Sequence, residues 1–223
     1  IALAEIDWEI SDLDGAWTHV QEALQTQPTH EAGKALFRKL ALAFADRSQQ
    51  DGELAEAVQW WNLVWRQDQR DLDTLRKMAR AHIALGQLSA AADCYAFALD
   101  LDPKDLETAH ILADIHRQRG DLKAAEKPLL RIVALDPRHA PSLRALLKLA
   151  RDRNNAPEAL KRAYDLLDVE PDDPESLFIM AWAHQQMLER RAGLEACKEL
   201  IAIDPQHAEG HHLMGQIARD LGD

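Results

Sequence analysis

Residues 101–105 read Leu-Asp-Pro-Lys-Asp, and a close variant of this stretch returns at a fixed interval along the chain. Leu135-Asp136-Pro137, Val169-Glu170-Pro171 and Ile203-Asp204-Pro205 each place a proline 34 residues after the previous one. A proline inside a helix loses a backbone hydrogen bond and clashes with the preceding turn. The four prolines therefore predict the boundaries of a repeated helical unit.

Each unit contains two stretches with helical periodicity and a turn between them. Before Pro103, apolar residues recur at three- and four-residue spacing in 72–82 and again in 88–99, and Gly86 separates the two stretches. The next unit repeats this order around Gly120, and Asp121 is placed to cap its second helix. The pattern predicts a helix–turn–helix hairpin in every unit.

Small residues recur at two fixed places in the unit, where two helices have to approach closely. The first helices carry Ala79, Ala113, Ala181 and Gly215, and the second helices carry Ala91, Ala125 and Ala159. There are two departures: Leu147 is a large residue in the first of these places, and Gly193 stands where the other second helices have alanine.

These features resemble the tetratricopeptide repeat (TPR) family, whose unit is a 34-residue hairpin with small residues and a proline at fixed positions. The resemblance covers nearly the whole chain. It implies an all-α fold, a right-handed α-solenoid in which about 13 helices stack as antiparallel hairpins in a superhelix, with no strand.

The resemblance predicts one solenoid domain over residues 1–223. Its repeats are expected at 1–30 (partial), 31–71 (long and atypical), 72–105, 106–139, 140–173, 174–207 and 208–223 (partial, or a capping helix). Pro28 and Pro103 are 75 residues apart, seven more than two periods. We place this surplus in the helix Glu31 to Gln50, because seven residues make about two helical turns. Since the first residue is Ile1 rather than Met, we expect a piece of a longer protein.

Composition narrows the classes of partner. The net charge of −12 disfavours nucleic acid, and no apolar run approaches the roughly 20 residues that cross a bilayer. Cys94 and Cys197 lie 103 residues apart, which predicts neither a disulfide framework nor a metal motif. The compartment stays open between the cytoplasm, which we favour, and the periplasm.

The histidines follow the repeat, which indicates packing and capping. One position of the unit holds His82, His116 and His184, and another holds His30, His139 and His207. His207 and His211 can share a helix face as zinc ligands, but no third distant ligand is identifiable. We therefore expect no metal site.

No catalytic motif stands out in the sequence. It has no glycine-rich phosphate loop, no Gly-x-Ser-x-Gly elbow and no cysteine with a plausible base. We expect no enzyme activity in this region and no cofactor. A catalytic domain elsewhere in a longer protein is left open.

In proteins that this sequence resembles, the first helix of each unit lines a concave groove in which ligands bind. The corresponding positions predict a partner-binding groove lined by Arg76, Lys77, Arg80, His110, Asp114, Arg117, Arg144, Lys148, Arg151, Phe178 and Trp182. Its arginines and lysines favour an acidic or carboxylate-bearing segment. Phe178 and Trp182, four residues apart, are expected to form an apolar shelf beside these cations.

The family's carboxylate clamp for chaperone C-termini is not expected here. That clamp needs a Lys-Asn pair, then Asn, then Lys-Arg. The corresponding positions hold Arg76 and Arg80, then Ile111, then Pro141 and Ala145.

The leading hypothesis is a protein–protein interaction scaffold that binds a peptide or protein segment in the concave groove. One alternative is an accessory region of a larger enzyme or of an envelope or secretion assembly. Another is a self-assembling repeat, a homo-oligomer in which the helix 208–222 docks on a neighbouring copy.

Overall fold

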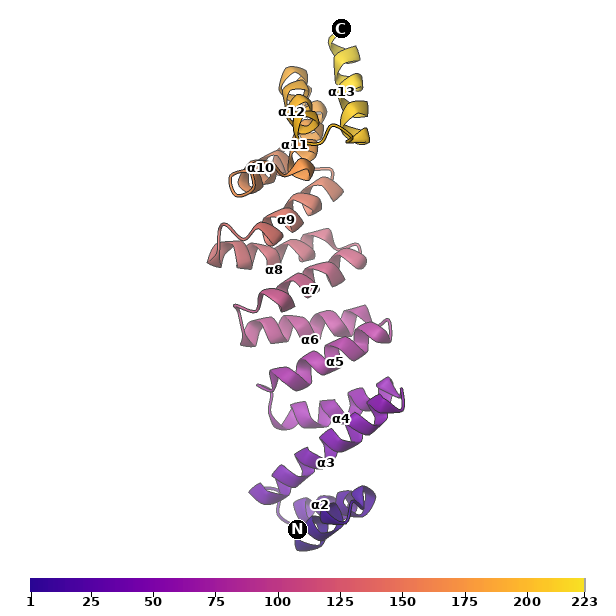
Figure 1. Ribbon diagram of the computed structural model, residues 1–223. Coiled ribbons are helices and arrows are strands. Elements are labelled where there is room, and N and C mark those ends of the chain that lie inside the picture. Colours follow the sequence, from indigo (N-terminus) through magenta and orange to yellow (C-terminus); the bar gives the residue numbers. More distant parts are fainter. Residues whose placement is uncertain (223) are drawn as a thin grey trace. The chain divides into compact units, whose positions relative to one another are not determined.

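The computed structural model describes residues 1–222, and within this range it contains thirteen α-helices and no strand. The expected all-α fold is confirmed, and so is the number of helices. The chain divides into two compact units, residues 1–102 and 103–223. Successive helices run in opposite directions within each unit (Figure 1). None of the described helices combines the length and the apolar character needed to span a bilayer.

The first unit contains three helical hairpins. Its helices are α1 (Ala2–Glu9), α2 (Leu13–Thr26), α3 (Glu31–Gln50), α4 (Leu54–Gln67), α5 (Leu72–Ala84) and α6 (Leu88–Leu101). Helix α3 has 20 residues, whereas α5 has 13. The seven surplus residues therefore lie in the helix in which the sequence placed them.

The second unit contains three hairpins and one further helix. Its helices are α7 (Leu106–Gln118), α8 (Leu122–Leu135), α9 (Ala140–Asp152), α10 (Ala156–Leu167), α11 (Pro174–Gln186), α12 (Arg190–Ile203) and α13 (Ala208–Leu221). All four periodic prolines lie between helices, as predicted. Helix α10 ends at Leu167, four residues before Pro171, which is earlier than in the other hairpins.

A side-chain cap begins the first helix of every hairpin after α1–α2, where Ile1 makes no such bond, and a cap also begins α13. Asp71, Asp105 and Asp173 accept a hydrogen bond from the backbone N–H three residues later. His30, His139 and His207 do the same through Nδ1, at 3.1, 3.3 and 3.0 Å. The repeated histidines at this position are therefore caps. Nδ1 must be unprotonated to accept, so these three caps require a neutral imidazole.

The turn inside each hairpin needs one residue in the left-handed region. Gly86 and Gly120 adopt φ of 71° and 77°, which glycine does without steric cost. Asn154 replaces glycine in the next hairpin, and Leu188 does so in the last one, with φ of 53° and 63°. A leucine in this region is strained because its Cβ approaches the following carbonyl oxygen.

The core lies where the two helices of a hairpin cross at small residues. Ala79, Ala91, Ala125 and Ala159 are each 0% exposed. Gly193 takes the same place in α12, and a Cβ there would lie 3.1 Å from Ile217 Cδ1 and 3.3 Å from the carbonyl oxygen of Ala181. The departure at Gly193 thus follows from the close approach of α11 and α13.

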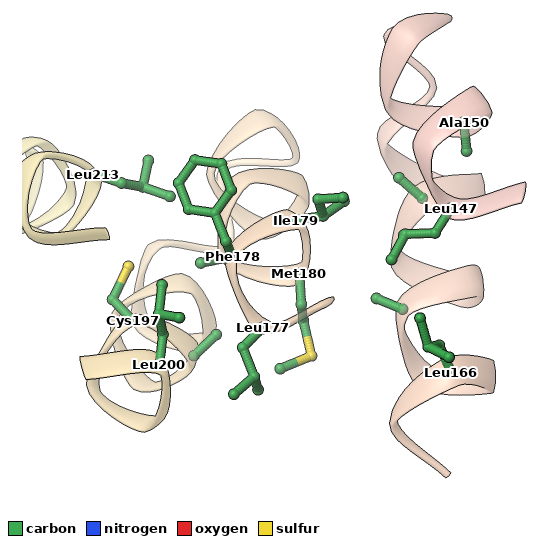
Figure 2. Close-up of a cluster of buried hydrophobic side chains, with 14 of the residues drawn as sticks. Leu147, Ala150, Leu166, Leu177, Phe178, Ile179, Met180, Cys197, Leu200 and Leu213 are labelled. Carbon is green, nitrogen blue, oxygen red and sulfur yellow. The ribbon is translucent and has the colours of Figure 1, made fainter. Parts of the chain in front are cut away.

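An extensive apolar cluster lies in the second unit and joins α9, α10, α11, α12 and α13 (Figure 2). Leu147, the other departure from the small-residue rule, is fully buried in this cluster together with Ala159 and Ala163. At the same position of α13, Gly215 is exposed and a Cβ there would meet nothing within 4 Å. No second helix follows α13 among the described residues, which explains this open place.

Leu188→Gly should raise the free energy of unfolding by about 1 kcal/mol, because it removes the strain of a left-handed leucine. Leu188 is 69% exposed, so little packing is lost. Urea unfolding measures the change, and Gly120→Leu should shift stability in the opposite direction. Equal stability of Leu188→Gly and the parent would show that the turn is not strained.

Ala125→Leu should lower the free energy of unfolding by about 1–3 kcal/mol, because the added atoms have no room between α7 and α8. Ala134→Leu makes the same change at an exposed position of the same helix and should have little effect. If both variants keep the parent's midpoint of thermal unfolding, the packing of α7 against α8 does not depend on a small residue at position 125.

Candidate functional site

One pocket in the second unit is lined by more of the predicted groove residues than the other pockets described below. We call it the Arg151 pocket. It has a volume of about 490 Å³ and lies between α7, α8 and α9, with one residue from α11. Its lining consists of His110, Ala113, Asp114, Arg117, Leu129, Ala145, Lys148, Leu149, Arg151, Asp152 and Glu175. Five of the predicted site residues therefore meet here, namely His110, Asp114, Arg117, Lys148 and Arg151.

The charges in the Arg151 pocket nearly balance. Arg117 forms an ion pair with Asp114 at 3.4 Å, and Lys148 pairs with Glu175 at 3.1 Å. Both pairs are about half exposed to solvent, so each contributes little stability and can be exchanged. Asp152 adds a further exposed carboxylate. The basic strip suggested by sequence, which already included Asp114, is therefore a mixed surface in this pocket.

Arg151 differs from the other cations of the pocket. Its guanidinium carbon lies 5.0 Å from the centre of the Phe178 ring, within the range of a cation–π interaction. It forms no ion pair with any residue in 1–222. The Phe178 ring therefore holds a cation whose hydrogen-bond donors are not used by a carboxylate of the chain.

His110 joins the pocket to the neighbouring cap. Its Nε2 lies 3.1 Å from Ser142 Oγ, which lies 2.8 Å from Nδ1 of the capping His139. Burial and the nearby His139 lower the pKa of His110, and Asp114 opposes them only in part. We therefore expect a neutral His110 at pH 7, so that the cations of the pocket are Arg117, Lys148 and Arg151.

Arg144 is used within the fold instead of lining the pocket. It forms ion pairs with Glu170 and, at 2.9 Å, with Asp173, the cap of α11. Burial alone would raise the pKa of Asp173, but hydrogen bonds from Ser176 and Arg144 outweigh it and lower that pKa. Arg144 therefore ties α9 to the start of α11.

The apolar shelf expected from Phe178 and Trp182 does not form as described. Phe178 is only 8% exposed, and its ring stacks on His207 at 5.3 Å. Figure 2 shows it directed toward Leu213 of α13. Trp182 is half-buried against the same cluster. The sequence pattern placed Phe178 and Trp182 on one face of α11. It could not show that α13 covers part of this face.

The three remaining predicted residues lie on α5 in the first unit. Lys77 and Arg80 line a second pocket there, and Arg76 is half-buried and does not line it. Glu175 is a charged residue of the Arg151 pocket that was not among the predicted residues. It comes from the first turn of α11, and its pairing with Lys148 of α9 has no signal in the repeat pattern.

The two cysteines and the histidines are the residues to consider for thiol and metal chemistry. Burial raises the pKa of Cys197 to about 11, and burial together with Asp93 raises that of Cys94 to about 11. Both thiols are therefore protonated near neutral pH. No group of three or more metal-ligating side chains lies together within residues 1–222. His207 caps α13, and His211 Nε2 lies 3.0 Å from the carbonyl oxygen of Pro205.

Comparison with solved structures identifies the fold. A crystal structure of MamA protein matches with a TM-score of 0.59 at 17% identity, over 78% of this chain and 94% of that one. YrrB, described as a TPR protein with an unusual peptide-binding site, matches with a TM-score of 0.59 at 16% identity, over 86% and 96%. MamA from Desulfovibrio magneticus matches with a TM-score of 0.55 at 16% identity, over 77% and 97%.

No family model and no curated protein matches the chain by sequence. The structural neighbours confirm the TPR fold that the sequence resembles, as an array of helical hairpins.

The lowered pKa of His110 predicts a pH dependence of stability. As the pH falls below about 6.5, the unfolded chain takes up a proton at this histidine while the folded chain does not, so folding becomes less favourable. His110→Gln should lose less stability than the parent between pH 7.5 and pH 5.5, measured by urea unfolding. His212→Gln, which removes an exposed histidine, is the control and should show the same pH dependence of stability as the parent. If His110→Gln also shows the parent's pH dependence, the lowered pKa does not belong to His110.

Proposed function

We propose that the chain is a protein–protein interaction scaffold, and that it binds a segment of a partner protein in the Arg151 pocket. The observation that carries this proposal is the Arg151 guanidinium, stacked on Phe178 at 5.0 Å and left without a carboxylate partner in the described chain. A preorganised cation in a concave site is the kind of group that anchors a ligand. The chain is similar in fold to YrrB, which is described as having an unusual peptide-binding site, and this similarity supports a peptide ligand.

The balance of charges sets the character of the segment. Asp114, Asp152 and Glu175 disfavour a uniformly acidic segment in this pocket, because like charges repel. One carboxylate on Arg151 is compatible with them. The acidic segment expected from sequence thus becomes a segment with one anchoring carboxylate, flanked by neutral or basic residues.

The size of the pocket fits this kind of ligand. A volume of about 490 Å³ holds one or two side chains, and the buried Ala113, Leu129 and Leu149 offer an apolar floor. The two exchangeable ion pairs at the rim can open toward polar groups of the partner at little cost. A short linear segment would therefore occupy the pocket without any change in the helices.

The test begins with selection of binding peptides from a random-peptide display library against the intact chain. The enriched peptides should share an Asp or Glu. Their affinity, measured by fluorescence anisotropy, should fall about tenfold or more in Arg151→Gln, which loses a charge-assisted hydrogen-bond donor.

Arg119→Gln is the matched control, because Arg119 is exposed at the end of α7 and does not line the pocket. Its affinity should stay within about twofold of the parent, since removal of a distant surface charge costs little. Peptides without a carboxylate, or equal binding to the parent and Arg151→Gln, would place the contact surface elsewhere.

A further inference from the structure

A second pocket lies entirely within the first unit, and we call it the Trp61 pocket. It has a volume of about 340 Å³ between the end of α3, helix α4 and helix α5. Its lining consists of Gln49, Leu54, Trp61, Lys77, Arg80, Ala81 and Ala84. The lining combines the polar side chains of Gln49, Lys77 and Arg80 with apolar residues.

The charge of the Trp61 pocket is positive. Lys77 and Arg80 line it, and no carboxylate does. Lys77 has one ionic partner, Asp73, at 3.3 Å, but that carboxylate is 79% exposed outside the pocket and holds the ammonium group weakly. Arg80 is exposed and forms no ion pair with any residue that the structure describes. The chain has a net charge of −12, so a pocket lined by two cations and by no carboxylate has the opposite charge to the chain as a whole.

Trp61 supplies an independent observation. It is 1% exposed, and its indole Nε1 is buried without a hydrogen-bond acceptor in residues 1–222. Most buried donors in folded proteins are paired, and an unpaired one lowers stability. Trp61 lines the pocket, so the pocket borders a buried side chain whose hydrogen-bond donor is unused.

We propose that the Trp61 pocket binds a carboxylate of an acidic peptide segment. Lys77 and Arg80 are three residues apart on one face of α5, so both can reach the same carboxylate. Leu54, Ala81 and Ala84 contact the aliphatic part of the side chain that carries it. The site is separate from the Arg151 pocket, and it does not require that pocket to be occupied.

The two pockets therefore select different ligands. The Arg151 pocket presents three carboxylates of its own, and the Trp61 pocket presents none. A segment with several acidic residues is excluded from the first and favoured by the second. The preference for an acidic partner that the sequence suggested thus resides in the first unit.

The test uses the intact, ¹⁵N-labelled chain and the indole N–H signals of its tryptophans. The signal of Trp61 is assigned from its absence in Trp61→Phe. The probe is the capped peptide acetyl-Leu-Glu-Glu-Leu-amide, and acetyl-Leu-Gln-Gln-Leu-amide is its neutral match. Inorganic phosphate, as a third probe, separates a carboxylate site from a general anion site.

The acidic peptide should shift the Trp61 signal saturably, and its dissociation constant should rise about tenfold in Arg80→Gln. Arg66→Gln, which removes an exposed cation of α4 outside the pocket, should leave that constant within about twofold of the parent's. Arg151→Gln should leave it unchanged, which separates this site from the Arg151 pocket. An equal shift by the neutral peptide, equal binding by Arg80→Gln, or binding of phosphate alone would overturn the proposal.

Discussion

The close approach of two helices at a pair of small residues is the constraint on which the rest of the structure depends. Ala79, Ala91, Ala125 and Ala159 are fully buried at these crossings, and only the α9–α10 hairpin has a large residue, Leu147, in one of the two positions. Gly193 tightens this contact further because Ile217 and a carbonyl oxygen occupy the space of a Cβ. The crossing at these residues therefore sets how closely the two helices of each hairpin can pack. The faces turned away from that point remain free to carry charge.

Intramolecular pairing decides which of those charges are already engaged within the chain. Arg144 is held by Glu170 and by the α11 cap Asp173, so it contributes to stability. Lys148 is held more loosely by Glu175, and Arg151 is held by an aromatic ring that leaves its donors open. Three basic residues on one helix thus have three different environments. A count of arginines and lysines along a groove does not distinguish them.

The sequence predicted the fold well because its signals are local. Proline spacing, capping residues and the seven-residue surplus in α3 can each be located without knowledge of distant contacts. The candidate site was predicted only in part, because the three basic residues of α9 depend on partners 26 to 29 residues away. Arg144 pairs with Glu170, and Arg151 lies on Phe178, through contacts that no periodicity encodes. Phe178 illustrates the limit most clearly, because its position on the helix was predicted and its cover by α13 was not.

Helix α3 shows how the fold accommodates a change of length. Its first half packs on α2 through Leu36 and Leu40, and its second half packs on α4 through Ala45. Seven added residues turn the helix by nearly two full rotations, so both halves keep their buried faces in line. Three or four added residues would give about one turn and leave a larger angular error between the halves. An insertion of seven residues therefore keeps the buried face of such a helix in phase, whereas an insertion far from a whole number of turns rotates that face away from its neighbours.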